Sequence, residues 1–296
     1  MKTIANAKET EWQQMHRLLF FVLVFMTGNA MAQDPVGQVP KWKKWETEAD
    51  TLMNRQNFEG AIKLYSKAIK SSRLKDKSAY SLLYKRAVCY YSTDQFEASL
   101  QDIETFMVEY PKLFQAHLLK AFIYRETDDK ENQLKALNEA LAIQPGDPGL
   151  IKWRSGLYLD DGKYQKVKED LQYVKSIQND PEVEMYLGFA YYNLKQVDSA
   201  FISLNKAIEL EPTYLPAYLY GGSFSLQESN NELALKYLDV ALKLDPENLN
   251  AQFYKGIALL ELDRIDEGCS LLAKAFYAGE DDAGDYLKEK CYTLTK

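Results

Sequence analysis

Few residues of this 296-residue chain are of a type and at a spacing that could support catalysis. Ser203 and Lys206 match the S-x-x-K spacing of a serine nucleophile and its lysine. No second motif accompanies them, and so short a pattern often occurs by chance. The acidic pairs at 160–161 and 281–282 fall in expected loops, where solvated carboxylates are commoner than acid–base pairs. We therefore expect no nucleophile or acid–base pair.

Metal, cofactor and redox chemistry have equally little support. The chain has two histidines, His16 and His117, and three cysteines, none in a C-x-x-C pair. Zinc sites and thioredoxin-type centres need closely spaced ligands of these types. Glycine-rich phosphate loops, H-E-x-x-H and G-x-S-x-G are also missing from the sequence. We expect His117 to be a packed or half-exposed helix residue, and the protein to be no enzyme and to use no cofactor or metal.

The amino-acid composition is typical of a folded protein, and the net charge is negative. Hydrophobic residues make up 46% and charged residues 27%, with 36 Lys+Arg against 43 Asp+Glu and a net charge of −7. A dedicated nucleic-acid binder needs a basic face for the phosphates. We therefore expect no nucleic-acid partner, and the lack of catalytic motifs leads us to expect no small-molecule substrate.

The segment 1–32 has the pattern of a secretory signal peptide. An apolar run at 18–26 follows a basic residue and precedes the small-x-small tripeptide Ala-Met-Ala at 30–32. The run is shorter than the roughly 20 residues that cross a bilayer. Cleavage would leave a soluble periplasmic chain that begins at Gln33 and touches the membrane only before cleavage. An uncleaved anchor is the alternative, and Met15 is an alternative start.

Prolines mark an internal repeat. Pro111 and Pro145 are separated by about 34 residues, as are Pro212 and Pro246, and the gap between these two pairs is about twice as long. A similar helix ending precedes the last three: Ala-Leu-Ala-Ile-Gln, Ala-Ile-Glu-Leu-Glu and Ala-Leu-Lys-Leu-Asp. A period of about 34 residues indicates stacked supersecondary units.

This pattern resembles the tetratricopeptide repeat family, whose unit is a helix–turn–helix of about 34 residues. The resemblance implies an all-α fold, a right-handed α-α superhelix of about seven units at 42–79, 80–113, 114–147, 148–180, 181–214, 215–248 and 249–282. A flexible leader at 33–41 precedes them, and a capping helix with a tail follows at 283–296. Extra residues at 73–78 predict a longer loop. The eighth position of every unit is small, which lets two helices approach closely: Ala49, Ala87, Ala121, Ser155, Gly188, Gly222 and Gly256.

In this family the first helix of each repeat lines the concave face. Large aromatic side chains, with an arginine and an asparagine, gather on the corresponding stripe, as binding surfaces favour. The candidate partner groove contains Tyr84, Tyr91, Phe122, Arg125, Trp153, Tyr186, Phe189, Tyr192, Asn193, Tyr220, Phe253 and Tyr254. We expect Tyr186, Phe189 and Tyr192 at its centre. The alternative is that these aromatics pack against neighbouring helices.

Two functions are compatible with these features. The first is a non-enzymatic scaffold in the periplasm of a double-membraned bacterium, which binds a peptide or helix of another envelope protein in the aromatic groove. The second is a structural subunit of an envelope assembly that uses the solenoid ends or the convex face. The Lys and Asn pattern with which some family members bind a peptide carboxylate is not evident.

The helix order implied by the resemblance brings Cys269, in the last second helix, level with Cys291 in the cap. Export permits disulfides, so the two cysteines are a possible pair, with Cys89 left free. The alternative is two buried thiols that pack as small apolar groups.

Overall fold

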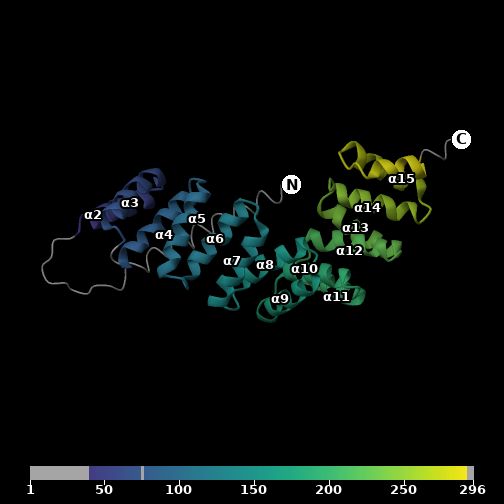
Figure 1. Ribbon diagram of the computed structural model, residues 1–296. Coiled ribbons are helices and arrows are strands. Elements are labelled where there is room, and N and C mark those ends of the chain that lie inside the picture. Colours follow the sequence, from purple (N-terminus) through teal and green to yellow (C-terminus); the bar gives the residue numbers. More distant parts are fainter. Residues whose placement is uncertain (1–39, 75–76, 292–296) are drawn as a thin grey trace. The chain divides into compact units, whose positions relative to one another are not determined.

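The computed structural model describes residues 40–74 and 77–291 (Figure 1). The predicted signal peptide, and the predicted leader up to residue 39, lie outside these residues. The described part of the chain consists of α-helices and one π-helical turn, without a strand. None of its helices combines the length and apolar character needed to span a membrane.

The helices group into two compact units, residues 1–147 and 148–296, which we call the N-terminal and C-terminal units. The N-terminal unit contains α2 (Lys41–Asn54), α3 (Phe58–Ser72), α4 (Lys77–Tyr91), α5 (Phe96–Glu109), α6 (Phe114–Glu126) and α7 (Lys130–Ile143). The C-terminal unit contains α8 (Pro148–Asp160), α9 (Tyr164–Ile177), α10 (Pro181–Asn193), α11 (Val197–Leu210), α12 (Leu215–Gln227), α13 (Asn231–Leu244), α14 (Leu249–Leu260), α15 (Ile265–Tyr277), α16 (Ala283–Tyr286) and the π-helical turn η1 (Leu287–Cys291).

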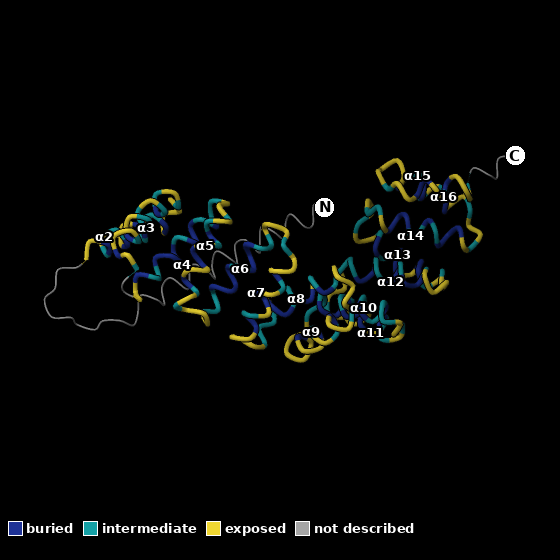
Figure 2. Tube along the Cα trace, viewed as in Figure 1, coloured by how far each residue is buried: buried dark blue, intermediate teal, exposed yellow. Residues whose placement is uncertain are grey.

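Within each unit the helices pack as consecutive antiparallel pairs, such as α2 with α3 and α10 with α11. The buried residues line the helix faces turned toward neighbours, while turns and outer faces are exposed (Figure 2). The fold is therefore the predicted all-α solenoid of helix pairs.

Helix starts locate the repeats. Five expected repeat starts are the first residues of a helix: Phe114, Pro148, Pro181, Leu215 and Leu249. The first two repeats differ. Helix α2 begins at Lys41, inside the expected leader, and α4 begins at Lys77, so the connection after α3 is shorter than the expected loop at 73–78.

One backbone feature recurs in every repeat. The fifteenth residue, in the turn between the paired helices, has a left-handed backbone with φ between 54° and 67°, at Gln56, Asp94, Asp128, Gly162, Lys195, Ser229 and Asp263. Side chains then cap several second helices. Asn57 Oδ1 accepts a hydrogen bond from Gly60 N at 3.0 Å, and Asn230 Oδ1 accepts one from Leu233 N at 3.2 Å. The same turn geometry therefore sets the angle of each helix pair.

Small residues at the eighth position make close helix contacts. All seven are buried. A Cβ atom added at Gly222 would lie 2.6 Å from Leu238 Cδ2, and one at Gly256 would lie 2.7 Å from Leu272 Cγ. The leucine of the second helix therefore fills the space that a side chain on the first helix would need.

In several repeats a polar side chain of the first helix contacts the carbonyl oxygen of the proline in the preceding turn. The contacts are His117 Nε2 to Pro111 O at 2.8 Å, Tyr218 OH to Pro212 O at 3.0 Å, and Gln252 Nε2 to Pro246 O at 2.7 Å. His117 is buried, and its Nδ1 lies 3.0 Å from Glu139 Oε2. The contacts of His117 thus hold the turn and the helix pair together.

The C-terminal end is closed by α16 and η1. Ala283 and Leu287 are buried against the last repeat, as a cap over its apolar face requires. Cys269 of α15 and Cys291 of η1 form a disulfide, with their Cα atoms 5.8 Å apart. Cys89 is a free, buried cysteine. The expected cap helix is therefore a short α-helix followed by a π-helical turn, and its expected end lies outside the described residues.

Candidate functional site

Five of the twelve predicted groove residues are buried, each at most 8% exposed: Tyr84, Tyr91, Phe122, Tyr192 and Phe253. Their rings pack on neighbouring helices; Tyr84, for example, lies 5.5 Å from the ring of Phe106. For these five the groove assignment is wrong, because the space beside each ring is occupied by the protein itself.

Tyr192 was expected at the groove centre and instead joins two repeats. Its ring stacks on Phe224 of α12, and its hydroxyl donates a hydrogen bond to Glu228 Oε1 at 2.9 Å. Two polar groove candidates are likewise engaged within the chain. Arg125 lies 5.1 Å from the ring centroid of Phe122 and bonds Glu126, while Asn193 Nδ2 donates to the carbonyl oxygen of Phe189 at 2.9 Å.

The remaining aromatics form a regular row in the C-terminal unit. Trp153, Tyr186, Tyr220 and Tyr254 occupy the sixth position of four consecutive repeats, at intervals of about 34 residues. They lie on α8, α10, α12 and α14, and each is half-buried. We call these four residues the aromatic row. All four were predicted groove residues, but their common repeat position separates them from the buried ones.

The tyrosines of the row lie on adjacent helices. Some Cα atoms of α12 lie within 8 Å of Cα atoms in α10 and in α14. Burial raises the pKa of Tyr186 and of Tyr220, and neighbouring tyrosines of the row add to both shifts. A neutral tyrosine hydroxyl is a hydrogen-bond donor. Within the described residues, the hydroxyls of Tyr186, Tyr220 and Tyr254 make no hydrogen bond.

Phe189 packs against the aromatic row. Its ring meets Tyr220 edge-on at 5.2 Å and also contacts Tyr164 at 6.0 Å. These contacts order the neighbouring rings, and aromatic pairs of this kind stabilise by about 0.5–1.5 kcal/mol beyond their buried area. Phe189 therefore supports the row more than it offers free surface.

The row has few cations beside it. Helices α10 and α12 contain no lysine or arginine. Lys255 of α14 is paired with Asp239 of α13 at 2.7 Å, and Lys152 of α8 is held by Asp180 at 2.9 Å and Glu182 at 2.6 Å. An anionic ligand would therefore find these lysines already neutralised.

The N-terminal unit has a different arrangement at the same repeat position. Lys85 stands there and is 6% exposed, with its Nζ 2.9 Å from both Glu46 Oε1 and Asp50 Oδ2. Tyr65 donates to Asp50 Oδ1 at 2.6 Å. Burial acts to raise the pKa of Glu46, but Lys85 and Lys43 more than offset this, and the pKa is lowered. This cluster links three helices and leaves little exposed surface.

The buried ion pairs were missed at the sequence level. A weak signal was present: Glu46 and Asp50 are four positions apart on one helix face. Two further ion pairs are bidentate: Arg86 bonds Asp102, and Arg154 bonds Asp170. Each joins the two helices of one repeat, so we interpret them as structural.

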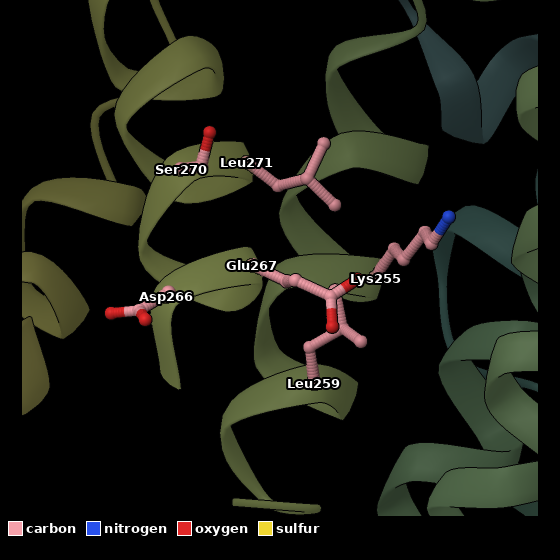
Figure 3. Close-up of a pocket in the computed structure, with 6 residues that line it drawn as sticks. All are labelled: Lys255, Leu259, Asp266, Glu267, Ser270 and Leu271. Atoms are coloured by element: carbon pink, nitrogen blue, oxygen red, sulfur yellow. The ribbon is translucent and has the colours of Figure 1, made fainter. Parts of the chain in front are cut away.

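A shallow hollow of about 370 Å³ lies between α14 and α15 (Figure 3). Its lining residues are Lys255, Leu259, Asp266, Glu267, Ser270 and Leu271. Lys255 is engaged by Asp239, and Glu267 is bonded by Arg264 at 2.6 Å. These pairings leave few groups for a ligand, so we assign none. Among residues 40–74 and 77–291 no group of His, Cys, Asp or Glu is arranged to hold a metal ion.

Comparison with known proteins agrees with this architecture of stacked helix pairs. Two family models, both described as Tetratricopeptide repeat, match residues 47–111 and 226–283, and residues 114–147 and 187–214. Together they match more than half of the chain. The protein belongs to the tetratricopeptide repeat family.

Among curated proteins, the chain is 21% identical over 246 residues to the BBSome complex member BBS4 homolog of Drosophila melanogaster, covering 80% of this chain and 51% of that protein. It is 27% identical over 195 residues to the TPR repeat-containing protein YpiA of Bacillus subtilis, covering 64% and 45%. The chain thus spans about half the length of these relatives.

Solved structures share the fold. The C-terminal part of a TPR repeat-containing protein from Cytophaga hutchinsonii has a TM-score of 0.63 and 19% identity, covering 81% of this chain and 98% of that one. PilW, a type IV pilus biogenesis factor, has a TM-score of 0.57 and 13% identity, with 70% and 98% covered. YrrB, described as a TPR protein with an unusual peptide-binding site, has a TM-score of 0.50 and 17% identity, with 63% and 97% covered. At these identities the likeness concerns the fold alone.

Proposed function

We propose that this protein is a non-enzymatic scaffold of the cell envelope that binds a peptide or helix of a partner protein across the aromatic row. The observation that carries the proposal is the row itself: four half-buried aromatic side chains at one repeat position, three of them tyrosines without a hydrogen-bond partner in the described residues. Tyrosine and tryptophan supply contact area at low entropic cost, and both are enriched in interface hot spots.

The envelope location rests on the predicted signal peptide at 1–32. Intact-mass analysis of the protein in a periplasmic fraction tests it, with a mature chain that begins at Gln33 as the expected result. A product that keeps positions 15–32 in the membrane would contradict it.

A second candidate function, a structural subunit of an envelope assembly, has its own support. Tyr277 at the end of α15 is 81% exposed and lies edge-on against Phe276, so the last repeat presents an exposed aromatic side chain that is not part of the row. In that case the solenoid end or an outer face would join the assembly, and the row would stay unoccupied.

Photocrosslinking in cells separates the two functions. A photoreactive phenylalanine is placed at position 220 in the row, at position 277 at the end of α15, or at position 173 on the second helix α9. Crosslinks to a partner from position 220 alone are the expected result. Crosslinks from position 277 without any from position 220 would favour the structural subunit and contradict our proposal.

A further inference from the structure

We propose that the segment bound by the aromatic row is a proline-rich stretch in the polyproline II conformation that carries lysine or arginine. This inference rests on the proposed function and concerns the same surface. Three observations support it: the spacing of the row, its tyrosine hydroxyls, and the charges beside it.

The spacing matches the period of polyproline II. Packed helices lie about 8–10 Å apart, and Tyr186, Tyr220 and Tyr254 stand at one position of three neighbouring first helices. A polyproline II helix has three residues per turn and rises about 3.1 Å per residue, so its side chains return to one face every ~9 Å. A segment that crosses the helices would place one residue in three against each tyrosine.

Other backbone conformations fit this spacing less well. Side chains on one face of a β-strand return every ~6.6–6.8 Å, because each residue rises about 3.3–3.4 Å. An α-helix presents neighbouring side chains of one face about 5.4 Å apart, one turn along its axis. Both would fall out of register with the row after one or two repeats.

The hydroxyls favour a backbone with free carbonyl groups. Tyr186, Tyr220 and Tyr254 make no hydrogen bond through their hydroxyls in the part of the chain that the structure describes. A tyrosine hydroxyl is protonated at neutral pH, and burial raises the pKa of the first two further. Polyproline II has no internal hydrogen bonds, so its carbonyl oxygens remain available as acceptors. An α-helical partner already uses most of its carbonyl groups within the helix. Aromatic grooves recognise proline-rich segments in this way, because such segments lose little conformational entropy on binding.

The charges beside the row favour a cationic segment. Residues 148–296 contain 16 Lys and Arg against 24 Asp and Glu, a net charge of −8, whereas residues 1–147 contain 20 against 19, a net charge of +1. Helices α10 and α12 contain no lysine or arginine, while Glu182 and Glu184 of α10 are already paired with Lys152 and Lys175, so the excess negative charge belongs to the unit as a whole. Lysine or arginine in the partner would meet this negative potential and could also lie over the aromatic rings.

Peptide binding to the purified full-length protein tests the inference. The probes are fluorescent twelve-residue peptides that repeat Pro-Pro-Lys, Gly-Ser-Lys or Pro-Pro-Glu, together with an amphipathic helical peptide of the same charge as the first. We expect Pro-Pro-Lys to bind at least about tenfold more tightly than the others. Equal binding of Pro-Pro-Lys and Gly-Ser-Lys would overturn the inference in favour of charge alone, and tighter binding of the helical peptide would overturn it in favour of a helix.

Variants locate the site and separate the hydroxyls from the rings. Replacing Tyr186, Tyr220 and Tyr254 together by Phe removes three donors and keeps the rings; we expect binding of Pro-Pro-Lys to weaken about tenfold or more. The matched control is Tyr173→Phe, since Tyr173 is 48% exposed on α9, and it should bind as the wild type does. Circular dichroism checks that each variant is folded. Unchanged affinity of the folded triple variant would overturn the inference.

The two proposals fail in distinguishable ways. Crosslinks from position 220 to a partner, combined with no preference for Pro-Pro-Lys, would support the scaffold function and contradict the inference that the bound segment is polyproline II. Crosslinks from position 277 alone would contradict both the scaffold function and the polyproline II inference.

Discussion

The ring of Tyr192 lies flat on the ring of Phe224, with the centroids 3.9 Å apart and the planes 4° apart. The contact joins α10 to α12, two first helices of successive repeats. Tyr192 therefore belongs to the interface between repeats, although it occurs on the same helix as Tyr186 of the aromatic row. Burial and the bond to Glu228 raise the pKa of Tyr192 to about 12, so its hydroxyl stays protonated and continues to donate.

This contact predicts that Tyr192→Ala destabilises the protein by about 3–5 kcal/mol, because removal of a buried ring leaves a cavity. Tyr192→Phe keeps the stacked ring and loses one hydrogen bond, so it should cost about 1 kcal/mol. Urea unfolding measures both. Tyr173→Ala, at a half-exposed site of α9, is the control and should change the unfolding free energy by less than about 0.5 kcal/mol. Equal effects at positions 192 and 173 would contradict the interface assignment.

Two glycines on first helices predict opposite effects of the same substitution. A Cβ atom at Gly222 would lie 2.6 Å from Leu238, so Gly222→Ala should destabilise by about 1–3 kcal/mol, and Gly222→Leu by more. A Cβ atom at Gly156 would meet nothing within 4 Å, so Gly156→Ala in α8 should stabilise by about 0.5–1 kcal/mol. Thermal unfolding measures both, and shifts of the same sign would show that the repeat register is wrong.

The bond between Cys269 and Cys291 closes a loop with a sequence separation of 22. In the chain-entropy treatment such a loop stabilises a protein by about 3 kcal/mol. Cys291→Ser should therefore lower the unfolding free energy of the oxidised protein by about that amount and have little effect under reducing conditions.

Thiol counting in denaturant without reductant checks the pairing directly. One free thiol per chain is expected, from Cys89, whose pKa in the folded protein is raised to about 12 by burial and by Asp50. Three free thiols would show that the disulfide between Cys269 and Cys291 is absent.

The carboxylates around Lys85 predict a specific dependence on pH. The pKa of Glu46 is lowered in the folded protein, so its ionised form stabilises the fold above its unfolded pKa, and this stabilisation is lost as the pH falls through the folded value, below about 4.5. The difference in unfolding free energy between wild type and Glu46→Gln should therefore be larger at pH 6 than at pH 3. A difference independent of pH would contradict the ionic role of Glu46.

Removing the cation of this cluster is the complementary test. Lys85→Met leaves the carboxylates of Glu46 and Asp50 without the cation that they share, and we expect it to cost about 3–5 kcal/mol near pH 7. The loss should shrink in acid as the carboxylate of Glu46 becomes protonated. Lys274→Met is a suitable control, since its pair with Glu247 is exposed on both sides.

The repeats themselves could be predicted from the sequence because their requirements are local. A small residue at position eight, a turn near position fifteen and a proline after the second helix are each imposed by nearby steric contacts. These signals recur with a period of about 34 residues, and five of the seven predicted repeat starts coincide with the first residue of a helix, for example Pro181 and Leu215. The first two repeats deviated where the signals are weakest, at Lys41 and Lys77.

The family, the helix pairs and the set of aromatic residues on the first helices follow from residue types and their spacing along the chain. Which of these aromatics stay accessible depends on the packing between repeats. Tyr186 and Tyr192 share one helix, yet a ring from the next repeat covers only Tyr192. Likewise, Lys85 meets the carboxylates of Glu46 and Asp50, which belong to the preceding repeat. The physical reason is that such contacts depend on how helices of different repeats lie against one another, which no local pattern of residue types encodes.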